Sequence, residues 1–349
     1  MSTLNQPLLI ANVNYHVGHW VAIYVAEEQS FFKQEGLTHY EYERGGLLPG
    51  PSESQTLGLA IKEHGVDIAT AVDTESAITQ RARGADVYIV GGWRYTPFLK
   101  WYGSKHITDM SKLRGGKIGV RENSADGGGL VEFFIEEALK EAGVNPETEV
   151  EMVQDPVFGY RNNPAHIDML RSGKVNAITS SPPFSDELEK EGYPVILDPN
   201  VVFPRRPGKV TVAPRRTVEE RSEELKAYFR AITRTFWFMR DVNNFQYLHD
   251  LETRLRKLTH NEDEQRLFIA SAPDRVDSWA LPMDGGIERH ALERIIQEMV
   301  KRGRLERPIP VADVFKDDAV RDAYRDVSTR AELKPAFNAA TTVLEKYGF

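Results

Sequence analysis

Residues 14–20, NYHVGHW, gather groups that can hydrogen-bond, transfer a proton or stack on a planar ring. His16 and His19 are three residues apart, and Tyr15 supplies an aromatic ring. A metal site at the two histidines would need carboxylates or distant histidines to complete it, because the chain contains no cysteine. Three roles stay open for them: packing or capping at a helix start, hydrogen bonding to a ligand, and proton transfer, in which His16 is favoured.

The elements around this cluster predict an α/β architecture. Residues 8–13 are an apolar run typical of a buried strand, and the spacing over 21–34 predicts a helix that ends before Gly36. Strands and helices alternate through 39–93, and the same alternation resumes over 117–191. This pattern predicts two similar α/β lobes, each built on a largely parallel sheet.

Two further patterns concern repetition and the C-terminal part. Segments 57–71 and 167–181 share one order: helix, glycine, polar residue, buried strand and small polar turn. Residues 218–241 predict one long helix whose aromatic residues fall on several faces, which favours core packing over a cofactor site. Most of the chain that follows also has helical character.

Composition excludes several classes of protein. The 349 residues carry a formal net charge of −8, so no global basic field attracts nucleic acid or anionic lipid. No run approaches eighteen apolar residues, which excludes a membrane-spanning helix from the prediction. The first residues lack the pattern of an export signal, so the chain as given is predicted to be cytoplasmic, or periplasmic if such a signal has been removed.

Three motifs carry a resemblance to a known fold. VAIYVAEEQSFFKQEGL (21–37) resembles the first helix of type II periplasmic-binding-protein folds, in the group that contains sulfonate-, taurine- and nitrate-binding proteins and thiamine-pyrimidine synthases. KLRGGKIGV (112–120) and LRSGKVNAI (170–178) resemble two later motifs of that group. The residues that match the first motif are Ala26, Glu27, Phe31, Phe32, Glu35, Gly36 and Leu37, while Ser30 stands where the group usually has glycine.

The resemblance implies a two-lobed fold with a ligand held in the cleft between the lobes and a helical C-terminal extension. Lobe 1 is then expected to comprise residues 1–92 and 208–245, and lobe 2 residues 105–197. Residues 93–104 and 198–207 are expected to cross between the lobes. Residues 246–349 would form a helical region packed mainly on lobe 1.

Candidate ligand contacts follow from position, because open α/β sheets bind ligands outside the carboxyl ends of their strands. Asp73 and Thr74 follow a predicted strand and begin a helix, where capping is the favoured role. Arg94 and Tyr95 lie at the expected first crossing, where the guanidinium can bind an anion or pair with an acid. Arg205 carries the same alternatives at the second crossing.

The turn RENSADGGG (121–129) follows a strand and precedes a helix, so its backbone amides can approach a ligand closely. It lacks the glycine spacing of a dinucleotide-binding turn, and a flexible linker is the alternative. The candidate ligand contacts in this lobe are Asn123, Ser124, Asp126, Gly127, Tyr160, Ser180 and Ser181.

Two functions remain. The favoured hypothesis is a solute-binding protein that closes on a small anionic or aromatic organic molecule, without a cofactor or metal, and with an ABC permease as partner if the chain is exported. The alternative is a cytoplasmic decarboxylase or lyase on the same fold, with His16 as acid or base. The absence of cysteine argues against likeness to the pyrimidine synthases and the desulfinases, which carry functional cysteines. A weaker hypothesis is a cytoplasmic ligand sensor that signals through the helical C-terminus.

Overall fold

The computed structural model describes residues 6–13, 17–43, 53–96, 100–120, 130–155, 158, 164–180, 184–199, 203, 205–258 and 280–347. The chain forms two compact units. Unit 1 comprises residues 1–95, 207–255 and 276–349, and unit 2 comprises residues 96–206 and 256–275.

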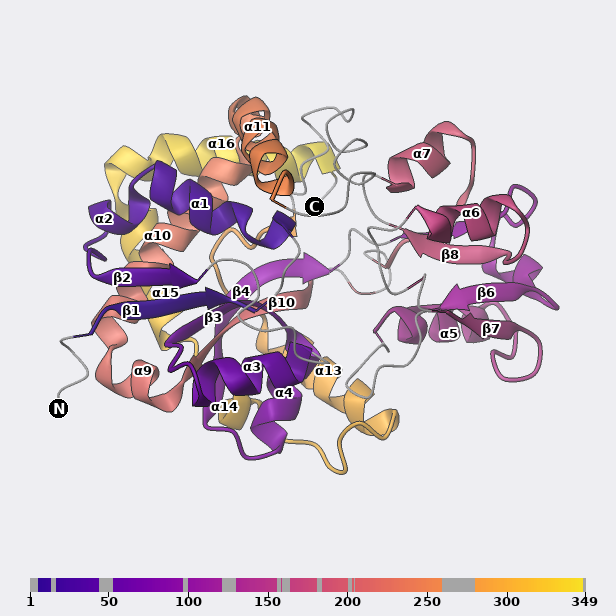
Figure 1. Cartoon of the computed structure of the whole chain (residues 1–349), viewed down its shortest axis with the longest axis horizontal. Helices are drawn as coiled ribbons and strands as arrows, with labels where there is room; N and C mark the ends of the chain where they lie inside the picture. The colour runs from indigo at the N-terminus through magenta and orange to yellow at the C-terminus, as the bar shows by residue number, and fades with distance from the viewer. Residues whose placement is uncertain are drawn as a thin grey trace. The chain divides into compact units, whose positions relative to one another are not determined.

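Unit 1 is built on a five-stranded sheet with the order β2-β1-β3-β10-β4. Its strands are β1 (Leu8–Asn12), β2 (Tyr40–Glu43), β3 (Ile68–Asp73), β4 (Val87–Thr96) and β10 (Arg206–Pro214). In Figure 1, α1 (Val21–Glu28), α2 (Phe31–Gln34) and α10 (Ser222–Arg240) lie on one side of this sheet, and α3 (Glu53–Lys62) and α4 (Thr74–Ala82) lie on the other.

The sheet of unit 1 is mixed rather than largely parallel. β1 pairs in parallel with β2 and β3, whereas β10 pairs antiparallel with β3. The repeating pattern of strands and helices did not predict this, because β10 enters the sheet only after residues 96–206 of unit 2 and is therefore not joined to β3 by a short βαβ crossover.

Unit 2 has a second five-stranded sheet with the order β7-β6-β8-β5-β9. β6 is parallel to β7 and β8, and β5 is antiparallel to β8 and β9. The strands are β5 (Lys100–Gly103), β6 (Lys117–Val120), β7 (Glu151–Gln154), β8 (Ala177–Ser180) and β9 (Val195–Leu197), and the helices are α5 (Leu130–Glu141), α6 (Ala165–Arg171) and α7 (Phe184–Lys190).

The remaining helices belong mainly to unit 1. They are α9 (Arg215–Glu220), α11 (Phe245–Arg256), α13 (Arg289–Lys301), α14 (Val311–Val314), α15 (Asp318–Thr329) and α16 (Lys334–Tyr347). Both α15 and α16 contact α10. Tyr228, Phe229 and Phe236 of α10 are fully buried, which confirms that the aromatic residues of this segment form core packing. Among the described residues, no helix is both long enough and apolar enough to cross a membrane.

Two helices predicted as continuous are interrupted. The predicted helix 218–241 belongs to two helices, α9 and α10, with a break at Arg221. Arg221 is buried there, and its guanidinium donates to Asp67 Oδ2 at 2.9 Å and to Glu224 Oε2 at 2.6 Å. These bonds fix the start of α10 against the beginning of β3.

The predicted helix 21–34 ends early, because Ser30 separates α1 from α2 in a left-handed conformation with φ 58°. The Ser30 N–H donates to the carbonyl of Glu27 at 2.9 Å, a geometry in which helices usually place glycine. The segment still ends at Gly36, whose φ is 87°. Both positions have the left-handed backbone that favours glycine, but the first of them carries serine.

Ser30→Gly is therefore expected to raise the free energy of unfolding by about 0.5–1 kcal/mol, because glycine has no Cβ to oppose a left-handed backbone. Ser30 is exposed, so the substitution removes no core contact. Chemical denaturation of the full chain measures the change. Ser30→Ala keeps the Cβ and is the control, and a gain of the same size in that variant would contradict the explanation.

Candidate ligand-binding site

Hydrogen bonds inside unit 1 connect the end of β1 to His19 and to β3. Asn12, at the end of β1, donates from Nδ2 to the carbonyl of His19 at 3.0 Å, and Thr70 Oγ1 donates to the carbonyl of Ala11 at 3.3 Å. His19 ends a short 3-10 helix, Val17–His19, and its side chain is buried. This burial favours the packing role among those that the sequence left open for His19.

Asp73 takes the N-cap position of α4, but its side chain does not cap the helix. Its Oδ1 instead lies 2.8 Å from Nζ of Lys209, at the register where β3 and β10 pair antiparallel. Asp73 therefore occupies the predicted N-cap position, while its carboxylate forms a charge-assisted contact with the ammonium on the adjacent strand. Lys209 is 12% exposed and Asp73 44% exposed.

Thr74, the first residue of α4, is buried and donates from Oγ1 to the carbonyl of Pro207 at 2.8 Å. Close by, the pairing of β3 with β10 shifts between Val210 and Val212, and Ala71 has a φ of 56°. A bulge of this kind bends a strand and redirects the side chains beyond it. It therefore sets the direction in which Asp73 leaves the sheet.

Arg94 and Tyr95 belong to β4 rather than to an irregular connection, and the predicted crossing 93–104 includes the end of β4 and all of β5. Arg94 is buried and Tyr95 is half-buried. The neighbouring Trp93 packs in the core, with its ring 5.7 Å from that of Phe236. β4 thus carries one buried guanidinium close to its C-terminal end.

In unit 2, Ser180 ends β8 with its Oγ 3.0 Å from Nε2 of His166. Both side chains are buried, and the imidazole also meets the ring of Phe184 edge to face at 5.3 Å. The sequence predicted Ser180 as a site residue but not His166, which precedes it by fourteen residues. The sequence could have indicated this pair, because His166 lies in the first turn of α6 and Ser180 ends β8, the strand that follows α6.

Arg205 and Arg206 lead into β10. Arg205 is exposed and has a left-handed backbone with φ 53°, whereas Arg206 is 1% exposed. The guanidinium carbon of Arg206 lies 5.9 Å from the ring centre of Phe134 and 5.8 Å from that of Phe203, within the range of cation–π attraction. A non-glycine residue held at positive φ is strained and is often found at functional sites.

The other predicted site residues lie outside the described residues. They are Tyr15, His16, Asn123, Ser124, Asp126, Gly127, Tyr160 and Ser181.

Most of the charged side chains described above are cationic, and few could act as nucleophiles. In unit 1, Lys209 and Arg94 are within a strand or two of Asp73 and Thr74 in the sheet order. Arg205 and Arg206 belong to unit 2. Ammonium and guanidinium groups form their strongest hydrogen bonds with carboxylates, sulfonates and other oxyanions. Among the described residues, no cluster of histidine and acidic side chains has the arrangement of a metal site.

Comparison with known proteins identifies the fold. A family model described as the NMT1-like family matches residues 111–251. No curated protein matches the sequence.

Solved structures match almost the whole chain at low identity. The periplasmic sulfonate-binding protein SsuA of Methylobacillus flagellatus is 15% identical with a TM-score of 0.67, and the match covers 94% of this chain and 96% of that one. The periplasmic nitrate-binding protein NrtA of Synechocystis is 11% identical with a TM-score of 0.61, over 93% and 90%. The desulfurization enzyme DSZB is 14% identical with a TM-score of 0.62, over 91% and 99%.

These matches agree with the two units and their mixed five-stranded sheets, and they confirm the fold that the N-terminal motif predicted. The chain therefore has the two-lobed type II periplasmic-binding-protein fold that is found in sulfonate- and nitrate-binding components of ABC import systems.

Proposed function

We propose that the protein is a solute-binding protein that reversibly holds a small organic anion, with a sulfonate or carboxylate group and an aliphatic or aromatic body. The observation that carries the proposal is Lys209, a largely buried ammonium at the carboxyl end of β3, in the fold of the sulfonate- and nitrate-binding proteins. Ligands of open α/β sheets bind at this end of the strands.

The pair formed by Asp73 and Lys209 suits reversible binding. Asp73 holds the ammonium in place, and its own carboxylate is nearly half exposed, so the pair lies where an incoming anion can reach it. Arg94 adds positive charge on the same sheet. Tyr95 and the residues outside the described ranges, Tyr15 among them, are proposed to contact the organic body of the ligand.

Enzymatic turnover is the competing function. Its specific support is the similarity to DSZB, a mutant of which was crystallised with biphenyl-2-sulfinic acid, and the hydrogen bond of His166 to Ser180. Both side chains of that pair are buried, however, which limits access of a substrate to the hydroxyl. Reversible binding is therefore the favoured function, and chemical conversion of the bound anion would show turnover instead.

The proposed partner is an ABC permease, and the proposed location is periplasmic. Both are suggested by solved structures of similar fold: one is described as the ligand-binding component of an ABC-type import system, and two others are described as periplasmic binding proteins. The resemblance further predicts that the lobes close on the ligand. Small-angle scattering at saturating ligand tests closure, since it lowers the radius of gyration, and an unchanged radius would count against it.

A thermal-shift screen tests the proposed function. Alkanesulfonates, aromatic sulfonates and aromatic carboxylates are compared with amines and sugars at equal concentration. An anion at about a hundred times its dissociation constant is expected to stabilise the protein by about 2.7 kcal/mol and to raise its melting temperature measurably. Stabilisation by amines or sugars alone would contradict an anion site.

Lys209→Met tests the residue assignment. Loss of one charge-assisted hydrogen bond is expected to weaken binding of the best anion by about 1.5–3 kcal/mol, or roughly 10- to 150-fold. Titration calorimetry measures the affinity. Lys117→Met is the matched control, because Lys117 also pairs with an acid on a neighbouring strand, Glu151 at 3.1 Å, but in unit 2 and with both side chains exposed. Equal losses in both variants would remove Lys209 from the site.

A further inference from the structure

Unit 1 contains a cavity at the end of the sheet opposite to the proposed anion site. Its volume is about 750 Å³. It lies between the C-terminal halves of α3 and α4, the residues that lead into β4, and the end of β10. Cavities that bind small molecules typically measure about 300–1,000 Å³, so this one has the size of a binding site.

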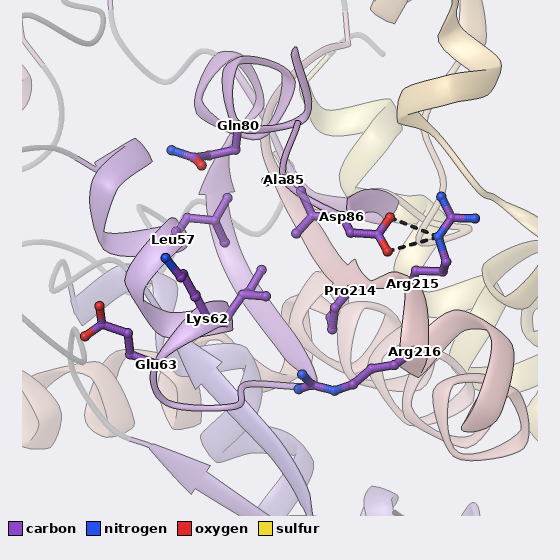
Figure 2. A pocket seen from close by; sticks show the side chains of 12 residues that line it. Leu57, Lys62, Glu63, Gln80, Ala85, Asp86, Pro214, Arg215 and Arg216 are labelled. Atoms are coloured by element: carbon purple, nitrogen blue, oxygen red, sulfur yellow. Dashed lines mark hydrogen bonds and ion pairs between the residues drawn. The ribbon is translucent and has the colours of Figure 1, made fainter. Parts of the chain in front are cut away.

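The cavity has an apolar base. Leu57 of α3, Val87 at the start of β4 and Pro214 at the end of β10 line it, and all three are buried. Ile61 and Ala85 add apolar surface closer to solvent, since both are partly exposed. Figure 2 shows Leu57, Ala85 and Pro214 with charged side chains around them. Such a lining favours an aliphatic or aromatic ligand over a fully polar one.

Both guanidiniums at the cavity already have a carboxylate partner. Arg215 donates from Nε to Oδ1 of Asp86 at 2.9 Å (Figure 2). Nη2 of Arg216 lies 3.2 Å from Oδ1 of Asp67, and it also donates to the carbonyl of Gly65 at 2.6 Å. Because opposite charges at these distances largely cancel, neither pair presents a net charge to a ligand.

Lys62 and Glu63 complete the charged part of the lining. They are adjacent at the end of α3, opposite in sign and both exposed, so water solvates both. A charged ligand would leave water for apolar walls, and it would have to displace an existing ion pair or compete for a solvated charge, which costs free energy. An uncharged ligand does not meet this penalty. The lining therefore selects against ionic ligands of either sign.

We propose that this cavity is a second small-molecule site, which takes an uncharged and mainly apolar molecule such as a medium-chain alcohol. The site is separate from the proposed anion site, because Pro214 lies five residues beyond Lys209 on β10, roughly 17 Å along the strand. The proposal does not depend on the function proposed above.

Titration calorimetry of the full chain with 1-octanol tests this site. Octanoate and octylamine, which have the same chain length, are the charged comparisons, and they are titrated into Lys209→Met so that the proposed anion site contributes little. 1-Octanol is expected to bind saturably to the wild-type protein and to Lys209→Met with equal affinity. In Lys209→Met it is expected to bind at least tenfold more tightly than either charged probe, because only those probes must lose ionic hydration.

Two variants that fill the cavity, Ile61→Trp and Ala85→Leu, are each expected to weaken 1-octanol at least tenfold. Ala142→Leu is the matched control, because it enlarges another partly exposed alanine that follows a helix, α5 in unit 2, and it is expected to leave 1-octanol affinity within twofold. Thermal unfolding shows whether each variant is folded. A tenfold loss in either folded filling variant, with Ala142→Leu unchanged, supports the site.

Four results would overturn the proposal. The first is absence of saturable 1-octanol binding, and the second is equal or tighter binding of either charged probe. The third is unchanged 1-octanol affinity in both Ile61→Trp and Ala85→Leu. The fourth is loss of 1-octanol binding in Lys209→Met, which would place the probe in the proposed anion site.

Discussion

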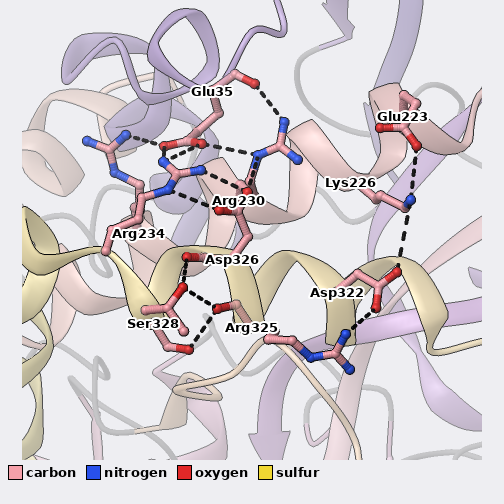
Figure 3. A network of polar contacts seen from close by, with 11 residues as sticks. Glu35, Glu223, Lys226, Arg230, Arg234, Asp322, Arg325, Asp326 and Ser328 are labelled. Carbon is pink, nitrogen blue, oxygen red and sulfur yellow. Dashed lines mark hydrogen bonds and ion pairs between the residues drawn. The ribbon is translucent and has the colours of Figure 1, made fainter.

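Glu35→Ala is expected to lower the free energy of unfolding by about 3–5 kcal/mol, because it removes the acid from a buried ion-pair network. The side chain of Glu35 is 1% exposed, and Nη1 of Arg330 lies 2.9 Å from both of its carboxylate oxygens. Arg230 approaches to 3.2 Å, and Arg234 also donates to the carboxylate. Figure 3 shows this carboxylate next to the guanidinium groups of Arg230 and Arg234 from α10.

The large effect follows from the charge that remains. Without Glu35, three guanidiniums lie close together, and the acid still paired with them among the described residues is Asp326, at 2.9 Å from Arg330 and 3.5 Å from Arg230. Partly buried like charges repel strongly when their counter-ion is removed. The network joins α2, α10 and the segment after α15, so its loss is expected to weaken attachment of the C-terminal helices to unit 1.

Urea denaturation measures the change in free energy of unfolding. Glu28→Ala is the matched control, because Glu28 is also a helical acid paired with an arginine, Arg254 at 3.0 Å, but with side chains 40% and 54% exposed. An exposed pair of this kind contributes less than about 1 kcal/mol. Similar losses in the two variants would show that burial of Glu35 does not set its contribution.

Trp237→Ala is expected to cost about 3–5 kcal/mol of folding free energy, for reasons of packing. Trp237 is fully buried on α10, and its ring lies 5.3 Å from that of Phe337 and 6.5 Å from that of Tyr324. Its Nε1–H donates to the carbonyl of Met283 at 2.7 Å. Truncation leaves a cavity between α10, α15 and α16 and deprives that carbonyl of its donor.

Trp237→Phe separates the two contributions. It keeps an aromatic ring in the core but removes the hydrogen bond and the smaller ring of the indole, so a smaller loss of about 1–3 kcal/mol is expected. Denaturation of the three proteins under identical conditions gives the comparison, and limited proteolysis reports whether α15 and α16 become accessible first. A loss under 1 kcal/mol in Trp237→Ala would contradict the assignment of this contact as a main attachment of the C-terminal helices.

The local structure was largely predictable, because it depends on short-range patterns. The segment TESAITQRA forms α4 over the predicted residues, and the repeated order of helix, glycine and strand appears with Gly65 and Gly173 at positive φ. The break at Ser30 was harder to foresee, since serine rarely adopts the left-handed backbone that glycine takes there. The antiparallel pairings in the two sheets could not be predicted in this way. They depend on how distant segments enter each sheet, and the hydrophobic periodicity of a single segment does not encode that.

The residues whose contacts underlie the proposed site and hold the fold lie far apart in the sequence. Lys209 meets Asp73 across 136 positions, the difference between their numbers, and Arg330 meets Glu35 across 295. Sequence patterns indicated the residue types at Asp73 and Glu35 but not their partners. His166 was missed for the same reason, because its significance depends on Ser180 at the end of the next strand. All of the predicted site residues stay predictions, and about half of them, including His16 and Asn123, lie outside the described residues.

The most direct test of the central claim is titration calorimetry with the best organic anion from the thermal-shift screen, followed by recovery of that anion from the protein. The account predicts saturable binding to wild-type protein, at least tenfold weaker binding to Lys209→Met, and recovery of the ligand chemically unchanged. Absence of binding by every sulfonate and carboxylate tested, or conversion of the bound anion into a product, would contradict a function limited to solute binding.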